Sequence, residues 1–174
     1  IGAGIIGLLT IQALKAAGCT KVYASDLSEA RLALAKELGA DEVFPAKTTA
    51  SLKDEMLKRT NGQGVDIAME AVGITATVTA AIESVRKGGH VGLIGNLAQK
   101  IEFPLQLVVT REITLFGSCA SAGEYPQALQ EIAAGRMDRG GEDLTQAGKT
   151  IGMITTILFG VSASFWCLIA ILFG

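Results

Sequence analysis

Three glycines near the start of the chain have the spacing of a phosphate-binding turn. Gly2, Gly4 and Gly7 form Gly-x-Gly-x-x-Gly directly before a segment that is apolar nearly all round. In such a turn one glycine makes the bend, the next lets the backbone approach a pyrophosphate, and the third lets a helix pack closely on a strand. The helix offers its unpaired N–H groups and the positive end of its dipole to the phosphates. A glycine-rich turn without a ligand is the alternative interpretation.

An acidic residue follows at the distance that this chemistry requires. Asp26 ends the next predicted strand, 19 residues after Gly7. A carboxylate at that place accepts hydrogen bonds from ribose hydroxyls and repels a 2′-phosphate, which favours NAD over NADP. The alternative is that Asp26 only makes a turn before Ser28. Arg31, one helical turn further on, fits either a contact with the adenine or a solvated helix charge.

Glycines also follow three later strands. The stretches are 71–73 (Ala-Val-Gly), 93–95 (Leu-Ile-Gly) and 115–118 (Leu-Phe-Gly-Ser). Ligands bind outside the carboxyl ends of the strands in a doubly wound sheet, so these stretches predict one shared cleft. Each glycine taken alone is equally explained by a turn.

Residue sets that would carry a reaction by themselves are missing from the sequence. It contains no Ser, His and Asp set, no Cys-x-x-Cys, no phosphate-loop Lys and no carboxylate pair on one predicted face. Cys19, Cys119, Cys167 and His90 do not have the spacing of metal ligands. His90 is interpreted as a packing or surface histidine. The sequence therefore predicts binding, with no catalytic residue and no metal ligand in this chain.

The elements that position these residues alternate along the chain. Short runs rich in Val and Ile alternate with helical stretches of about ten residues, which is typical of a parallel sheet covered by helices. The predicted fold class is α/β, a doubly wound parallel sheet. Predicted helices cover 5–17, 28–39, 51–59, 75–85, 105–111 and 125–134, and predicted strands cover 21–25, 42–44, 65–70, 89–94 and 113–116.

Composition narrows the function classes. The 174 residues are 49% hydrophobic and 18% charged, and the length suggests one folded domain. A net charge of −2 gives no basic surface for nucleic acid, so nucleic-acid partners are not expected. An odd number of widely spaced cysteines favours an intracellular protein without a disulfide framework.

The last 24 residues differ from the rest. Between Ile151 and Gly174 there is no charged side chain, and 17 residues are apolar. A helix over 151–173 would be about 35 Å long, enough to cross a hydrocarbon core of about 30 Å. We therefore expect a transmembrane helix at 151–174, a linker at 139–150 and a dinucleotide-binding domain at 1–138. The basic residues before the segment place that domain in the cytoplasm, in a tail-anchored topology. A buried helix is the alternative.

With these residues in view, the chain resembles the C-terminal cofactor domain of medium-chain, zinc-dependent alcohol and polyol dehydrogenases. The branch is the one that holds the sorbitol, galactitol-phosphate and threonine dehydrogenases. The resemblance runs in order from residue 1 to about Met137, through the stretches IGAGIIGLLTIQALKAAG, ASDLSEARLALAKELGADEVF, GQGVDIAMEAVG, VRKGGHVGLIG and REITLFGSCAS. It implies a Rossmann-like fold and hydride transfer between NAD and a secondary alcohol or polyol.

The resemblance also implies a role for each residue of the cleft. Gly4, Ile5 and Ile6 would hold the pyrophosphate of NAD, and Asp26 and Arg31 the adenosine end. The middle of the cleft would be lined by Val72, Gly73, Ile94 and Gly95, and the nicotinamide carboxamide would be held by the backbone at Thr114 and Phe116.

Two departures from the family pattern are expected to matter. The chain begins at the last residue of the family's first strand, so most of that strand and the zinc-binding domain are absent, and the zinc of the parent enzyme has no ligands here. After Asp138 the sequence no longer follows the family. Pairing of two copies through the edge near 101–103 and 113–116 is a further expectation.

Two alternatives to a dehydrogenase part remain at this stage. A methyltransferase also places a glycine-rich loop and an acidic residue after successive strands, but its sheet would end in an antiparallel strand pair. The second alternative is a catalytically incomplete nucleotide-binding module that is tethered to a membrane.

Overall fold

The computed structural model describes residues 1–119 and 125–135. Helices and strands alternate along nearly the whole of this part, as the sequence predicts. The helices are α1 (Ile5–Ala16), α2 (Glu29–Glu37), α3 (Leu52–Arg59), α4 (Thr75–Ser84), α5 (Leu105–Thr110) and α6 (Tyr125–Ala133). The strands are β1 (Tyr23–Asp26), β2 (Glu42–Pro45), β3 (Val65–Glu70), β4 (Val85–Leu93) and β5 (Thr114–Gly117).

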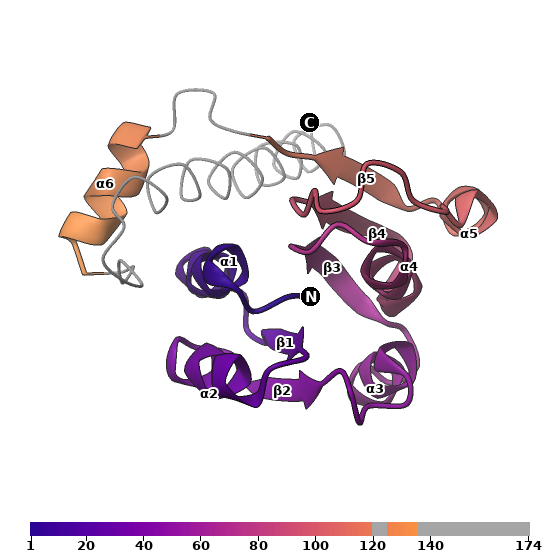
Figure 1. Cartoon of the computed structure of the whole chain (residues 1–174), viewed down its shortest axis with the longest axis horizontal. Coiled ribbons are helices and arrows are strands. Elements are labelled where there is room, and N and C mark those ends of the chain that lie inside the picture. The colour runs from indigo at the N-terminus through magenta and orange to yellow at the C-terminus, as the bar shows by residue number, and fades with distance from the viewer. Residues whose placement is uncertain (120–124, 136–174) are drawn as a thin grey trace, which may run out of the picture.

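All strand pairs are parallel, but they form two sheets. One sheet pairs β1 with β2, and the other has the order β3-β4-β5. The first two residues of the chain lie between them (Figure 1). Gly2 N donates to Ser25 O at 2.8 Å, on the β1 side, while Ala71 N donates to Ile1 O at 2.9 Å on the β3 side. The α/β class with parallel pairing is confirmed.

Helices cover both sides of the strands. In Figure 1, α1 and α2 lie on one side of the row of strands, and α3, α4 and α5 lie on the other. Leu8, Ile11 and Val22 belong to the core on the first side, and Val78 and Ile82 to the core on the second. Both cores are apolar on the strand side and the helix side, which explains the Val- and Ile-rich runs of the sequence.

Two helices begin with a serine cap. Ser28 Oγ accepts a hydrogen bond from Arg31 N at the start of α2, and Ser51 Oγ accepts one from Asp54 N at the start of α3. A hydroxyl at this position pairs one of the N–H groups that a first helical turn leaves open.

The start of β4 differs from the sequence prediction. The strand was expected to begin at Gly89, but it begins at Val85, which pairs with Val65. The register then shifts, so that Ile67 lies opposite His90, and Gly88 has a φ of +67°. Gly88 and Gly89 therefore form an irregularity inside the strand. In the sequence alone, the same two glycines indicate a strand boundary.

The predicted linker at 139–150 and the predicted transmembrane segment at 151–174 lie outside the described residues. Within residues 1–119 and 125–135, no helix is long and apolar enough to cross a membrane.

Candidate functional site

Glycine allows the turn before α1 to pack against the helix that follows it. Gly2 has a φ of +88°, and a Cβ at this residue would lie 2.7 Å from Val72 Cγ2. A Cβ at Gly7 would lie 1.8 Å from Gly2 O, a distance that no side chain can occupy. The first and third glycines of the motif therefore have the bending and packing roles that their spacing predicts.

The start of α1 is open where a ligand is expected. Gly4 caps the helix without a side-chain hydrogen bond, and a Cβ built on it would have no neighbour within 4 Å. Ile5, the first helical residue, is 51% exposed. The N–H groups of this first turn have no side-chain cap at Gly4, and together with the helix dipole they favour an anion.

The Asp26 side chain, at the end of β1, is hydrogen-bonded to the backbone of the glycine turn. Its Oδ2 accepts a hydrogen bond from Ala3 N at 2.7 Å, and its Oδ1 accepts one from Ser28 N at 2.8 Å. Arg31 Nη1 lies 3.9 Å from Oδ2, and the Arg31 side chain is 60% exposed. Asp26 therefore makes a turn before Ser28 and also bonds the glycine turn. A carboxylate has about four acceptor positions, so these two bonds leave capacity for ribose hydroxyls.

Two of the predicted cleft turns meet each other directly. A Cβ at Gly95 would lie 2.2 Å from Gly73 N, and a Cβ at Gly73 would lie 2.4 Å from Asn96 N. Gly73 has a φ of +84°, which also favours glycine. The turns after β3 and β4 are thus in backbone contact, and Val72 joins them to Gly2.

Glu70 holds these turns together, and sequence reasoning did not single it out. Its carboxylate is fully buried, and Oε1 accepts hydrogen bonds from Val72 N at 2.8 Å and Gly73 N at 2.9 Å. Its backbone oxygen accepts from Ile94 N at 2.8 Å and Gly95 N at 3.0 Å. The available signal was an acidic residue at the end of a strand, directly before the turn at 71–73.

Thr114 and Phe116 lie further from the glycine turn, on the last strand of the three-stranded sheet. Both are in β5, next to β4, where Thr114 pairs with His90 and Phe116 with Gly92. The Phe116 ring packs against the His90 ring at 5.9 Å between centroids. This contact agrees with the packing interpretation of His90, whose Nδ1 is buried without a hydrogen-bond partner in the described part of the chain. The structure does not bring Thr114 into contact with the glycine turn.

Residues for a zinc site do not come together in the part of the chain that the structure describes. No group of three or more His, Cys, Asp or Glu side chains there could hold a metal ion. Cys19 is half-buried, Cys119 is exposed, and Cys167 lies outside the described residues. The described residues therefore do not fit a catalytic zinc, which needs three convergent protein ligands.

Comparison with known proteins adds to this geometry. The family model described as "Zinc-binding dehydrogenase" matches residues 6–134. L-idonate 5-dehydrogenase of Vitis vinifera is 32% identical over 141 residues, which are 79% of this chain and 38% of the relative. Sorbitol dehydrogenase of Bacillus subtilis is 34% identical over 140 residues, with coverages of 79% and 39%. The chain thus spans about two fifths of the length of the curated relatives it matches.

Solved structures of dehydrogenases are also similar to this chain. The 2R,3R-butanediol dehydrogenase of Bacillus subtilis has a TM-score of 0.73 at 34% identity, over 79% of this chain and 39% of that one. A Sinorhizobium meliloti protein assigned as a zinc-binding dehydrogenase was solved bound to NADP. Its TM-score is 0.72 at 27% identity, over 79% of this chain and 41% of that one. Among the described residues, β5 runs parallel to β4 and not as part of an antiparallel pair, which argues against the methyltransferase alternative.

Substitution of the packing glycine is expected to destabilise the domain. Gly7→Ala forces the α1 backbone away from Gly2 O and should lower the free energy of unfolding by about 1–3 kcal/mol, as overpacking does. Gly4→Ala is the matched control, because its Cβ enters open space and should change stability by less than about 1 kcal/mol. Urea unfolding followed by circular dichroism measures both. Equal effects of the two substitutions would show that the close approach at Gly7 is not needed.

The buried carboxylate of Glu70 is expected to matter more than an exposed one on the same strand. Glu70→Gln removes the negative charge that the two N–H donors face and replaces one acceptor oxygen with an NH₂ group, and should cost about 1–3 kcal/mol of unfolding free energy. Asp66→Asn, whose side chain is 80% exposed and pairs with Arg86, should cost less than about 1 kcal/mol. Thermal unfolding measures both variants. A loss for Asp66→Asn as large as that for Glu70→Gln would contradict the role of Glu70.

Proposed function

Because the chain belongs to the zinc-binding dehydrogenase family, we propose that it is the NAD-binding part of an alcohol or polyol dehydrogenase. The observation that carries the proposal is the meeting of four features at one edge of the sheets. These are the uncapped start of α1, the Asp26 carboxylate, and the two turns that pack through Gly73 and Gly95. Parallel strands bind ligands at this edge.

The two ends of a dinucleotide would be held by different chemistry. The N–H groups of Gly4, Ile5 and Ile6 would bind the pyrophosphate, supported by the dipole of α1. The carboxylate of Asp26 would accept hydrogen bonds from the adenosine ribose, and the exposed guanidinium of Arg31 would lie beside the adenine. The open space around Gly4 and the spare acceptor positions of Asp26 support this assignment.

The remaining cleft residues would bind the middle and the nicotinamide end. Val72, Gly73, Ile94 and Gly95 would line the path between the two ends, on turns that the Glu70 carboxylate and backbone oxygen hold in place. The backbone at Thr114 and Phe116 would hold the carboxamide. Gly2 and Gly7 would act indirectly, because they let the turn and α1 approach closely enough.

The chemistry of the reaction belongs to the bound nicotinamide, which accepts a hydride from a secondary alcohol or polyol. The described residues of this chain bind and orient the dinucleotide, and none of them is assigned a proton or hydride transfer. No zinc step is assigned either, because no zinc ligands converge in this part of the chain. The names of the relatives, sorbitol and L-idonate dehydrogenases, support a polyol or secondary alcohol as substrate.

The domain limits and the tail belong to the same proposal. Residues 1–138 would form the dinucleotide-binding domain, 139–150 a linker, and 151–174 a membrane span. The uncharged length of the last segment supports the span. Alkaline carbonate should leave the full chain in the membrane fraction and release a variant that lacks 151–174. Release of both would exclude the span.

Cofactor preference tests the assignment of Asp26. Isothermal titration calorimetry of the chain should show NADH binding at least about tenfold more tightly than NADPH, since facing like charges cost free energy. Asp26→Asn keeps an oxygen acceptor for Ala3 N and should narrow the difference. Asp54→Asn in α3 removes an equal charge away from the cleft and should leave the difference unchanged. Equal affinities of the unsubstituted chain for the two cofactors would refute the assignment.

A further inference from the structure

The turn that ends α3 places an Asn-Gly pair at the surface. Asn61 and Gly62 lie between α3 and β3, and both are exposed. Asn61 directly follows Thr60, the C-cap of the helix, and has a φ of +53°. Asparagine is one of the few residues besides glycine that adopt this left-handed conformation at the end of a helix. A Cβ built on Gly62 would have no neighbour within 4 Å, so the surroundings of the pair are open.

An Asn-Gly pair contains both reactants of an intramolecular reaction. When the Gly62 nitrogen gives up its proton to base, it can attack Cγ of Asn61. A new C–N bond closes a five-membered succinimide, the bond from Cγ to Nδ2 breaks, and ammonia leaves. Water then opens the ring at either carbonyl and gives aspartate or isoaspartate. The reaction consumes one water, releases one ammonia and involves no oxidation or reduction.

The fold holds the attacking nitrogen in a hydrogen bond. Gly62 N donates to Leu57 O at 2.8 Å, which closes the six-residue turn that ends many helices. A nitrogen in this bond is not free to attack, so the turn must open before the reaction occurs. The opening is local, because Asn61, Gly62 and Gln63 are all exposed.

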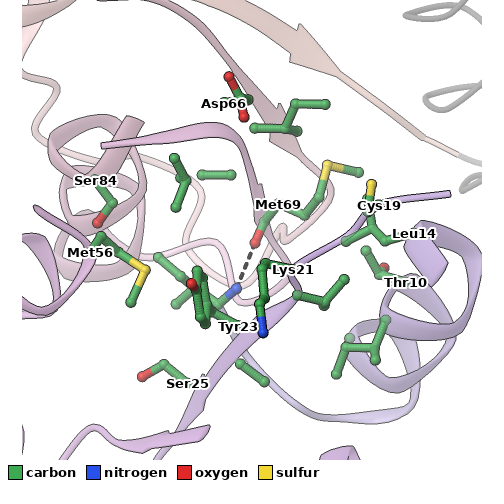
Figure 2. A pocket seen from close by; sticks show the side chains of 18 of the residues that line it. Thr10, Leu14, Cys19, Lys21, Tyr23, Ser25, Met56, Asp66, Met69 and Ser84 are labelled. Carbon is green, nitrogen blue, oxygen red and sulfur yellow. Dashed lines mark hydrogen bonds between the residues drawn. The ribbon is translucent and has the colours of Figure 1, made fainter. Parts of the chain in front are cut away.

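The Thr60 hydroxyl fixes the two ends of this turn. Thr60 Oγ1 donates to Met56 O at 2.7 Å and accepts from Gly64 N at 2.8 Å. Met56 is buried, and its side chain lines a cavity between β1 and β3 (Figure 2). Gly64 packs on the end of α4, where a Cβ would lie 2.7 Å from Ser84 O. The hydroxyl is therefore a part of the turn that a substitution can remove without changing the Asn-Gly pair.

We propose that Asn61 is a site of spontaneous deamidation, and that the turn at the end of α3 sets its rate. The exposed Asn-Gly pair supplies both reacting groups. The hydrogen bond from Gly62 N to Leu57 O and the two bonds of the Thr60 hydroxyl slow the reaction.

The isoaspartate product weakens the end of α3. Its main chain runs through the side-chain carbons of residue 61, which adds one atom to the turn and breaks the fit of the bond to Leu57 O. The new carboxylate lies at the negative end of the helix dipole. The nearby cations Lys58 and Arg59 are already paired with Glu55. Modification therefore lowers the stability of the domain.

Asn96 is an internal control with the same exposure and a similar hydrogen bond. It is exposed, and the N–H that follows it, that of Leu97, donates to Val72 O at 3.2 Å. The difference is the leucine side chain, which hinders attack by its own main-chain nitrogen. Asn61 and Asn96 are the two asparagines of the sequence.

The test is peptide mapping by mass spectrometry after the full chain is incubated in mildly alkaline buffer, either folded or in guanidinium chloride. Trypsin separates the two asparagines onto peptides 60–86 and 88–100, and fragment ions distinguish Asn61 from Gln63. Methyl transfer by an L-isoaspartyl methyltransferase identifies isoaspartate. In the folded chain Asn61 should be modified while Asn96 stays intact, about tenfold or more slowly than Asn61 in guanidinium chloride. The Tm of the modified chain should be lower by about 2 °C or more.

Thr60→Val removes the two hydroxyl hydrogen bonds and should speed modification of the folded chain by about fivefold or more. Thr60→Ser keeps the hydroxyl and should leave the rate close to that of the unsubstituted chain. Amide exchange of Gly62, read by NMR on the unsubstituted chain, measures the opening of the turn without any substitution.

Equal modification of Asn61 and Asn96 in the folded chain would overturn the proposal. So would equal rates at Asn61 in the folded and unfolded chains, or a Gly62 amide that exchanges as fast as in the unfolded chain. A Thr60→Val variant that keeps its circular dichroism spectrum and reacts no faster than Thr60→Ser would overturn the role of the turn.

Discussion

The close approach of backbone to backbone at the carboxyl ends of the strands is the constraint on which the rest of the structure depends. A Cβ at Gly7 would lie 1.8 Å from Gly2 O, and one at Gly95 would lie 2.2 Å from Gly73 N. Only glycine permits both contacts. They bring the start of α1 and the turns after β3 and β4 to one edge, where unpaired N–H groups can meet a ligand.

Two buried carboxylates hold this edge in place. Asp26 bonds the N–H of Ala3 in the glycine turn and the N–H of Ser28 before α2. Glu70 bonds two N–H groups of the turn after β3, and its backbone oxygen bonds two more after β4. An ionised carboxylate only accepts hydrogen bonds, so it can bind several backbone N–H groups at once. The proposed cofactor site thus depends on one carboxylate that would touch the ligand and one that only positions the turns.

Much of the fold was predictable because its signals are local. The periodicity of apolar residues located nearly every helix and strand, and Ser28 and Ser51 marked helix starts that the structure confirms. The start of β4 was not predictable, because Gly88 and Gly89 look like a boundary in sequence and form an irregularity in three dimensions. The role of Glu70 also escaped, since its backbone oxygen accepts hydrogen bonds from Ile94 N and Gly95 N, which follow another strand. The positions of Thr114 and Phe116 came from family resemblance, and their role stays a prediction.

The most direct test of the account is a titration of the isotopically labelled chain with NADH, followed by the amide signals of the described residues. The account predicts saturable shifts at Ile5 and Ile6, at Val72 and Gly73, and at Ile94 and Gly95, with residues of α3 unaffected. Saturating NADH that leaves these six amides unmoved, or that moves only amides elsewhere, would contradict the claim that this edge binds the dinucleotide.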